Sequence, residues 1–347
     1  MASEIVKRAD VARRSFVAGG AAIAGLMAGG GAFMRVAQAQ GTDFKIQFDW
    51  LMSNGQLGDV VALKKGFFAE QGLTVEFNPG GPNAQTVPPV LSGQSIMGEF
   101  SGSGQALVAH GNGLPIRMLA AGYQRGPFSF FSLPKNPVRK PADLVGKRVG
   151  IQPTARFLLD LILKRHGIDP AKVDVINIGF DMSPILSGQV DVITGFRTNT
   201  KALSVIGADR VVMTEDDTGL YSYANVYFTS EDSLVRHAEP LRKAMTALAK
   251  GWGYAFANRA EAVDLLCSNY PNLDREIEKA TADLVMQLSF NADTRRDGWG
   301  TFSAARIQEQ IDLFEQAKRF EKRKPSVDGF STRSILDATA SVRPKLG

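Results

Sequence analysis

The sequence has few of the residues that metal centres and thiol chemistry need. Its 347 residues include one cysteine, Cys267, and three histidines, His110, His166 and His237. A single cysteine excludes an intrachain disulfide, and its apolar surroundings in AVDLLCSNY indicate a buried packing residue rather than a nucleophile. The scattered histidines show neither zinc-ligand spacing nor the HExxH pattern. We therefore expect no metal site and no cofactor.

Motifs for catalysis are missing as well. The sequence contains no P-loop and no G-x-S-x-G. GSGQALVAHGNG lacks the third glycine of a dinucleotide-binding fingerprint, because Leu107 stands in its place. Asp216 and Asp217 are interpreted as a solvated loop, and KRFEKRK (318–324) as a basic helix end. The residue patterns predict a protein that is not an enzyme.

The net charge is small when the first 39 residues are left out. The whole chain carries 40 Lys and Arg against 35 Asp and Glu, a net charge of +5. Those first residues hold five basic and two acidic side chains, so the remainder has 35 against 33, or +2. Net charge therefore gives no support to nucleic-acid binding.

Residues 1–39 have the pattern of an export signal peptide rather than of a folded segment. Arg13-Arg14 precede Phe16 and a Gly/Ala-rich apolar run (17–33), and the segment ends at Ala37-Gln38-Ala39, a small-x-small cleavage site. The run is a poor membrane helix by length and hydrophobicity. The paired arginines resemble a twin-arginine signal. An ordinary export signal and an uncleaved anchor are the alternatives. We expect export to a bacterial periplasm, with cleavage near Ala39.

From Phe44 onward, short apolar strands alternate with amphipathic helices, which predicts βαβ units and a parallel sheet. Three prolines in FSLPKNPVRKPADL (131–144) separate two such series, and residues beyond about 230 are predominantly helical. The expected strands are 44–50, 73–77, 95–100, 115–123, 147–151, 173–178 and 190–195. The expected helices are 57–70, 83–92, 103–111, 155–166, 181–187, 232–267, 273–290 and 303–320.

A weak internal repeat suggests two lobes built alike. VLSGQSIMGEF (90–100) and ILSGQVDVITGF (185–196) each join a helix end to a strand through Leu-Ser-Gly-Gln. Gly93 and Gly188 suit the left-handed position that closes a helix. Chance similarity of a common helix–strand joint is the alternative.

Ligands of open α/β sheets bind beyond the carboxyl ends of the strands. Five loops occupy such positions in the predicted order and are expected to face one cleft: 51–56, 78–82, 101–104, 152–156 and 196–200.

Two of these loops carry candidates for an anion site. In IQPTARFLLDLILKRHG (151–167), Thr154 suits a helix N-cap, and the N–H groups of 155–157 would be free to bind an anion or a carbonyl. Arg156 would add a charge-assisted contact, with a solvated arginine on a capped helix as the alternative. Arg197 is interpreted either as a second clamp or as one half of an ion pair on the rim.

Aromatic and amide side chains supply the remaining candidates. Trp50 ends the first strand, and tyrosines alternate near the predicted return to the first lobe; together they would stack a flat ring, or they are core packing. Asn199 and Asn225 offer both donors and acceptors. The complete predicted ligand-binding set is Trp50, Asn54, Ser101, Gly102, Phe128, Thr154, Ala155, Arg156, Arg197, Asn199, Tyr223 and Asn225.

The stretch DWLMSNGQLGDVVALKKGFFAEQGLTVEF (49–77) resembles the opening of the NMT1/THI5-like family of ABC-transporter solute-binding proteins. Further matches, in the family's order, are LSGQ (91–94), PADLVGKRVGI (141–151), ILSGQVDVITGF (185–196) and the segment 223–266. Each motif is modestly specific, and their order and spacing carry the resemblance over most of the chain.

The resemblance implies an α/β fold of the periplasmic-binding-protein type II class, with two α/β lobes whose parallel-rich sheets are joined by two crossover strands. Lobe 1 would comprise 41–129 plus 229–347, and lobe 2 would comprise 130–228. A monomer would close on a small-molecule ligand and deliver it to the permease and ATPase subunits of an ABC importer.

The ligand stays open at this point. Family ligands include thiamine-pyrimidine precursors, riboflavin, nitrate, sulfonates and aromatic carboxylates. Trp50 and Asn54 favour a flat heteroaromatic, whereas Arg156 and Arg197 favour an anion.

Two other roles within the family remain to be weighed. The family's enzyme makes the thiamine pyrimidine with an active-site histidine after the third strand and a cysteine-rich motif. Here Phe100–Gly104 contain no histidine and residues 219–228 no cysteine, which counts against that chemistry. A sensory binding protein is a third alternative.

Overall fold

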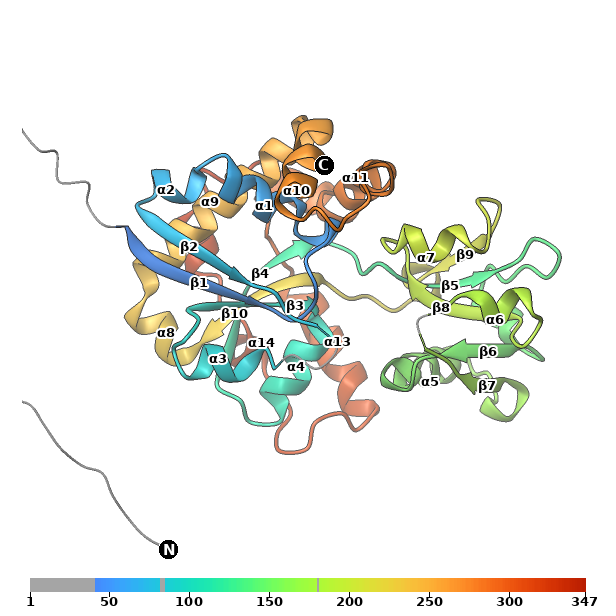
Figure 1. Ribbon diagram of the computed structural model, residues 1–347. Helices are drawn as coiled ribbons and strands as arrows, with labels where there is room; N and C mark the ends of the chain where they lie inside the picture. The colour runs from blue at the N-terminus through green and yellow to red at the C-terminus, as the bar shows by residue number, and fades with distance from the viewer. Residues whose placement is uncertain (1–40, 82–84, 180) are drawn as a thin grey trace, which may run out of the picture. The chain divides into compact units, whose positions relative to one another are not determined.

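The computed structural model describes residues 41–81, 85–179 and 181–347, which form two five-stranded sheets (Figure 1). The predicted signal peptide and its cleavage site at Ala39 lie outside the described residues. So does part of the predicted loop 78–82 and of the predicted helix 83–92.

The first sheet has the strand order β2-β1-β3-β10-β4. Its parallel part consists of β1 (Thr42–Phe48), β2 (Leu73–Asn78) and β3 (Met97–Gly102). The late strand β10 (Ala224–Ser230) lies between β3 and β4 (Ile116–Tyr123) and is antiparallel to both. The chain therefore returns to the first sheet after building the second.

The second sheet has the order β7-β6-β8-β5-β9. Here β6 (Arg148–Ile151), β7 (Asp174–Asn177) and β8 (Val192–Phe196) are parallel. The strand β5 (Phe128–Ser132) is antiparallel to its two neighbours, β8 and β9 (Val211–Thr214). Both sheets are thus mixed, because in each of them the first strand after a crossing, β5 or β10, is antiparallel to its neighbours.

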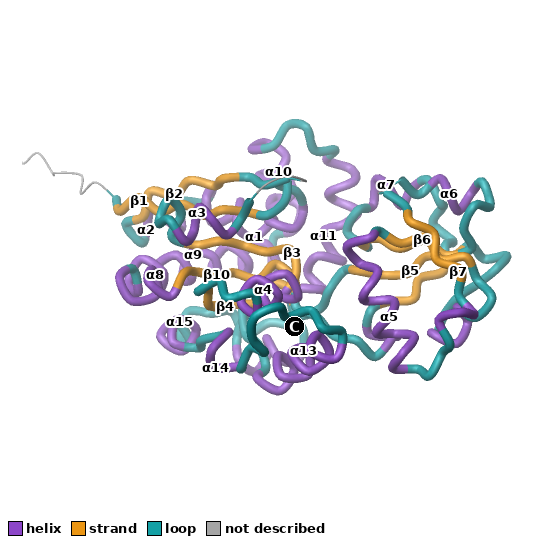
Figure 2. Tube along the Cα trace, turned by 90° about the horizontal axis from the view of Figure 1, so that it is seen from below, coloured by secondary structure: helices purple, strands orange, loops and turns teal. Residues whose placement is uncertain are grey.

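Helices cover the sheets. In Figure 1, α1, α2 and α9 lie on one side of the first sheet and α3 and α4 on the other. Figure 2 shows α5, α6 and α7 around the second sheet. The helices are α1 Leu57–Lys64, α2 Phe67–Glu70, α3 Val87–Leu91, α4 Ser103–Gly111, α5 Arg156–Arg165, α6 Ser183–Leu186, α7 Thr200–Ser204, α8 Glu231–Arg236, α9 Ala238–Ala257, α10 Arg259–Asn269, α11 Arg275–Ser289, α12 Ala292–Asp297, α13 Ala304–Gln316, α14 Val327–Phe330 and α15 Ser334–Ala338. Short 3-10 turns are η1 Asn54–Gln56, η2 Pro141–Leu144, η3 Pro153–Ala155, η4 Pro170–Lys172 and η5 Asp216–Thr218.

Most predicted elements are confirmed, but the list of expected strands lacks β5, β9 and β10, and two long predicted helices are broken. The predicted helix 57–70 is two helices, because Gly66 adopts the left-handed conformation at φ 77° and ends the first. The predicted helix 232–267 is three helices, interrupted at His237 and Asn258, whose backbones leave the helical region. The two connections between the sheets, 124–127 and 215–223, are irregular segments with one 3-10 turn rather than strands.

The predictions for Gly93, Gly188 and Cys267 are confirmed. Gly93 and Gly188 close their helices with φ of 76° and 74°. Gly167 does the same after α5, with φ 63°. Cys267 is buried within the core of the first sheet and its helices.

Two glycines allow α1 and α9 to approach closely. A Cβ on Gly58 would lie 2.2 Å from Cδ2 of Trp252, and one on Gly251 would lie 2.2 Å from the carbonyl oxygen of Gly58. Trp252 is completely buried and stacks on Trp299, with ring centroids 5.6 Å apart. The indole of Trp252 therefore fills the space that a side chain at position 58 would need.

Gly58→Ala should lower the free energy of unfolding by about 1–3 kcal/mol, because the new methyl group collides with a close-packed indole. Urea denaturation followed by circular dichroism measures the change. Gly179→Ala is the matched control, since its Cβ would meet no heavy atom within 4 Å. Equal stability of the two variants would show that the α1–α9 contact relaxes at little cost.

Candidate functional site

The loops at the carboxyl ends of the parallel strands of the two sheets are in contact. Nδ2 of Asn54, in the turn after β1, donates to the carbonyl oxygen of Thr198, in the loop after β8, at 3.2 Å. Asn54 is buried. A segment of the first sheet and a segment of the second, 144 residues apart in sequence, thus meet where ligands of α/β sheets bind.

Asn225 stabilises the turn that carries Asn54. It lies in β10 with φ 48°, is buried, and its Nδ2 donates to the carbonyl oxygen of Gly55 at 2.6 Å. Asparagine tolerates the left-handed region better than most residues. The amide nitrogen of Asn225 is therefore engaged with the backbone of the turn.

Asp49 organises the loop after β3. Its carboxylate accepts hydrogen bonds from the backbone N of Ser101 at 2.8 Å and from Oγ of Ser101 at 2.6 Å. Burial raises the pKa of Asp49, although the bonds from Ser101 act in the opposite direction. Gly102 donates its N–H to Oε1 of Gln105 at 3.2 Å. Ser101 stays exposed and is held in one orientation by Asp49.

Exposed aromatic side chains mark one strand end in each sheet. Among the large hydrophobic residues of the described ranges, Trp50 is 38% exposed and Phe196 is 42% exposed. Trp50 follows β1, and its carbonyl oxygen accepts from the N–H of Gly80 at 2.9 Å. Phe196 is the last residue of β8. Each aromatic residue lies within a few residues of the Asn54–Thr198 contact.

Sequence reasoning did not include Phe196 in the site. The available signal was the same as for Trp50, an aromatic residue at the point where a strand gives way to a polar loop. Phe128, which was predicted, is buried and packs edge to face against Phe196, with centroids 6.0 Å apart. Phe128 therefore supports the exposed ring.

Tyr223 is 1% exposed, so its ring belongs to the core of the first sheet. Its hydroxyl accepts from the backbone N of Ser303 at 2.8 Å, and burial raises its pKa. The burial of Tyr223 agrees with the alternative in which the tyrosines pack in the core. Tyr221 lies edge to face on Tyr223 at 5.3 Å.

The start of α5 differs from its prediction. The helix N-cap is Ala155, without a side-chain cap, so the prediction that Thr154 caps the helix is wrong. Pro153 starts a 3-10 turn in which Ala155 N donates to Gln152 O at 2.9 Å and Arg156 N donates to Pro153 O. Two of the three N–H groups expected to be free are thus used, because the tighter turn delays the helix. The Thr154 side chain lies outside the described part of the structure.

The two candidate arginines have different surroundings. Arg156 is partly buried like Arg197, but its Nε pairs with Oδ1 of Asp160 at 3.0 Å, one turn along α5, which agrees with the alternative of an arginine on the helix surface. Arg197 is partly buried, and burial lowers its pKa. Its Nε is closed to solvent and has no hydrogen-bond partner among the described residues. Asn199 is exposed, and its Oδ1 accepts from Ala202 N at 3.5 Å to cap α7.

Buried acids lie beneath the turn that carries Asn54. Glu99 is 1% exposed, and its Oε2 accepts from Nε2 of Gln56 at 3.2 Å. Oε1 of Gln56 in turn accepts from the backbone N of Ser53 at 3.2 Å. Asp59 is fully buried and accepts from the Tyr227 hydroxyl at 2.7 Å. Burial raises the pKa of Asp59 to about 7 and that of Glu99 well above its ordinary value.

The described residues offer no cluster of three or more His, Cys, Asp or Glu side chains that would hold a metal ion. A cavity of about 150 Å³ lies near the far end of α4, lined by His110, Glu231, Arg323, Lys324, Pro325, Ser326 and Gly329. Ligand pockets usually measure about 300–1,000 Å³. This cavity is smaller, has no large aromatic ring in its lining, and is distinct from the strand-end loops.

Solved structures identify the fold class. A periplasmic sulfonate-binding protein of a putative sulfonate ABC transporter from Methylobacillus flagellatus superposes with a TM-score of 0.65 at 13% identity, over 87% of this chain and 94% of that chain. The α/β architecture of two mixed sheets is therefore the periplasmic-binding-protein fold, as predicted.

The chain belongs to the NMT1/THI5 like family, which its residues 54–262 match. The formylaminopyrimidine-binding protein of Halalkalibacterium halodurans is 26% identical over 312 residues, covering 84% of this chain and 90% of that protein. The 4-amino-5-hydroxymethyl-2-methylpyrimidine phosphate synthase of Legionella pneumophila is 22% identical over 221 residues, covering 62% of this chain and 69% of that protein. Relatives thus include both a binding protein and an enzyme.

The buried acids predict a stability that falls as pH rises. Because the pKa of Asp59 moves from 3.8 to about 7 on folding, the folded protein keeps a proton that the unfolded chain releases. Between about pH 4 and pH 7, one such group lowers the free energy of unfolding by up to about 1.4 kcal/mol per pH unit. Asp59→Asn should flatten this slope in urea titrations at several pH values.

Asp43→Asn is the control, since Asp43 is an exposed acid at the start of β1. A slope that Asp59→Asn and Asp43→Asn change equally would contradict the assignment to the buried site. Glu99 adds to the slope in the same direction, so Asp59→Asn should remove a part of it and not the whole.

Proposed function

We propose that this protein is the solute-binding component of an ABC importer. It binds a small organic ligand, either a flat heteroaromatic ring or an organic anion, between the strand-end loops of its two sheets. The observation that carries the proposal is the Asn54–Thr198 hydrogen bond, with Trp50 exposed four residues from Asn54. The match to a formylaminopyrimidine-binding protein over 90% of its length supports the same role.

The two sheets support a division into two lobes around the ligand. We propose two lobes that lie close to the predicted division into 41–129 plus 229–347 and 130–228, with boundaries adjusted to the sheets. Because β5 starts at Phe128 and β10 starts at Ala224, the sheets favour boundaries within the connections 124–127 and 215–223. Two connections side by side permit one lobe to rotate against the other, which is how such a protein would close on its ligand.

Within the predicted site, side-chain surroundings separate two kinds of role. Trp50, Ser101, Arg197 and Asn199 are at least partly accessible, so we propose them as ligand contacts. Asn54 orders the contact between the loops. The buried or backbone-engaged members would position these residues rather than touch the ligand: Gly102, Phe128, Ala155, Tyr223 and Asn225.

The partners follow from the transport role. We propose that the protein acts in the periplasm as a monomer and passes its ligand to permease and ATPase subunits at the inner membrane. The paired arginines and the Ala37-Gln38-Ala39 site support export by the twin-arginine route and cleavage near Ala39. In the ranges that the structure describes, no helix is long and apolar enough to cross a membrane.

A catalytic role is the second candidate, because a relative is named as a synthase. Residues 100–104, after the third strand, carry no histidine, and the one cysteine lies buried in α10. We therefore propose binding without turnover. Release of a chemically altered product from any bound ligand, without a second protein, would favour the enzyme.

A thermal-shift screen over pyrimidines, flavins, nitrate, sulfonates and aromatic acids should find a ligand that raises the melting temperature. Binding should quench tryptophan fluorescence, because Trp50 is exposed whereas Trp252 and Trp299 are buried. Trp50→Ala should weaken binding by about 2 kcal/mol and abolish the quenching, if a ring stacks on the indole.

Val235→Ala is the control, since Val235 is an exposed apolar residue on α8. Unchanged affinity in Trp50→Ala, together with lowered stability, would assign Trp50 to packing. A screen in which no compound raises the melting temperature would remove the main support for the transport role.

A further inference from the structure

The guanidinium of Arg197 is partly buried and forms no ion pair with any residue that the structure describes. It follows the last residue of β8, and its backbone N–H donates to Pro127 O at 2.9 Å, which fixes the start of its side chain. Among the described residues the side chain has neither a hydrogen bond nor an ion pair, and its Nε is closed to solvent. Removing a guanidinium from water without a partner is costly, so such a group is a candidate for a ligand contact.

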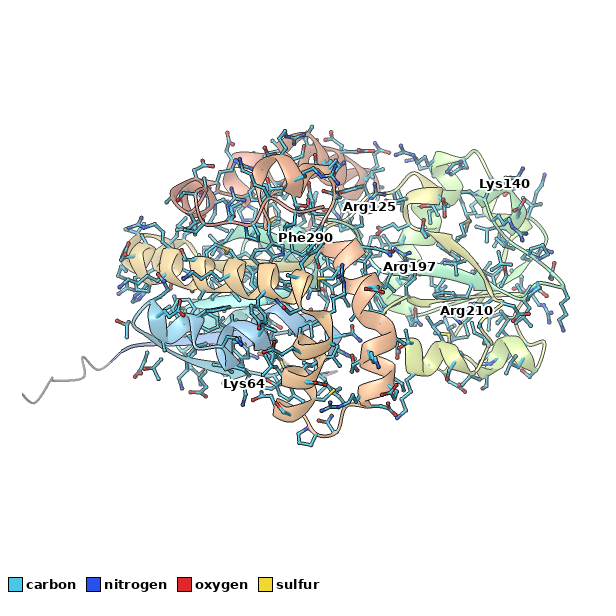
Figure 3. All side chains as sticks on the ribbon, turned by 90° about the horizontal axis from the view of Figure 1, so that it is seen from above. Lys64, Arg125, Lys140, Arg197, Arg210 and Phe290 are labelled. Atoms are coloured by element: carbon cyan, nitrogen blue, oxygen red, sulfur yellow. The ribbon has the colours of Figure 1, made fainter. Side chains whose placement is uncertain are left out.

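Other arginines near the strand-end loops and the connections have partners. Arg125 pairs with Asp216, and Arg156 pairs with Asp160. Arg306, at the start of α13, pairs with Asp293 at 2.9 Å. Figure 3 shows Arg125 and Arg197 where the chain passes between the two sheets. Arg197 thus differs from these arginines, because its guanidinium has no carboxylate partner among the described residues.

The charges near Arg197 do not supply that carboxylate. Asp217 favours the charged form of Arg197, but one of its oxygens already accepts from N and Oγ1 of Thr214, at 2.8 and 2.7 Å. Arg125 carries the same charge as Arg197 and opposes it. Because Arg125 is paired with Asp216, the guanidinium of Arg197 is the group at this place that an approaching anion could pair with.

An exposed aromatic ring adjoins this cation in sequence. Phe196 is 42% exposed, and Phe128, its cross-strand partner, supports it edge to face. Phe128 in turn lies edge to face on Phe130 at 5.6 Å. The ring of Phe196 is therefore braced by a packed row of aromatic residues, and it lies two residues from the carbonyl of Thr198 that Asn54 contacts.

We infer that the ligand is an aromatic ring bearing a carboxylate or another oxyanion, with Phe196 contacting the ring and Arg197 pairing with the anion. This inference rests on the proposed function and chooses between the two ligand classes left open there. A planar guanidinium matches a carboxylate with two parallel hydrogen bonds, which an uncharged ring substituent does not offer. Phe196 and Arg197 are specificity-determining residues, and Arg156, already paired with Asp160, is not.

The test compares ring pairs that differ only in the charged group. Benzoate and benzamide, nicotinate and nicotinamide, and benzenesulfonate and benzenesulfonamide are titrated into the purified protein by calorimetry. The anion of at least one pair should bind about 10-fold or more tightly than its amide, as expected for a charge-assisted hydrogen bond. Arg197→Gln should remove that preference and leave amide binding within about threefold.

Controls separate the site from a general charge effect. Arg139→Gln removes the same charge from an exposed loop before η2 and should keep the preference. Arg197→Lys keeps the positive charge but lacks the planar guanidinium with its two parallel donors, so it should retain part of the preference for the anion. This variant also tests the inference if Arg197→Gln does not fold. Loss of the preference in Arg156→Gln instead of Arg197→Gln would overturn the inference.

Failures of the inference and of the proposed function are distinguishable. Equal binding of acid and amide, or a preference that survives Arg197→Gln, overturns the inference while the solute-binding role stands. The inference is also overturned, and the solute-binding role also stands, if an uncharged pyrimidine or flavin binds while no compound of the ring pairs does. If no compound of either panel binds, the proposed function fails, and the inference fails with it.

Discussion

The position of β10 between β3 and β4 is the constraint on which the rest of the structure depends. A strand formed after the second sheet completes the first, so the chain must cross twice, at 124–127 and 215–223. The Tyr221 hydroxyl donates to the carbonyl oxygen of Gln124, which ties the two crossings together. β10 also carries Asn225, whose amide holds the turn after β1. The single strand β10 therefore completes the first sheet, requires the chain to cross twice between the sheets and stabilises a turn of the candidate site.

Burial of polar groups gives that site its order. Asp49 orients Ser101, Glu99 and Gln56 hold the backbone of Ser53, and Asp59 binds the Tyr227 hydroxyl. The three acids are largely withdrawn from water, and burial raises the pKa of each of them. A loop fixed by buried hydrogen bonds is ready to meet a ligand without further ordering, which lowers the entropic cost of binding. Arg197 is the exception, since the described residues provide its guanidinium with no partner.

The fold was largely predictable from the sequence, whereas the site was predictable only in part. Trp50 was expected at a strand end and is exposed there, yet its counterpart Phe196 was passed over as the last residue of a strand. Tyr223 and Asn225 were expected in the site, but the sheet buries both. Thr154 was expected to cap α5, but the 3-10 turn that starts at Pro153 shifts the cap to Ala155. Local patterns show where strands end, and they do not show which side chains the second sheet leaves accessible.

The sequence by itself determined the alternation of strands and helices, the glycines that close helices at 93 and 188, and membership of the NMT1/THI5 like family. These features depend on local backbone preference and on periodic burial, which a short window of residues contains. Only the tertiary structure decided that the guanidinium of Arg197 has no partner among the described residues, and that Asn54 meets Thr198. Desolvation and contacts between loops depend on residues far apart in the chain, so they are settled when the sheets and their loops come together.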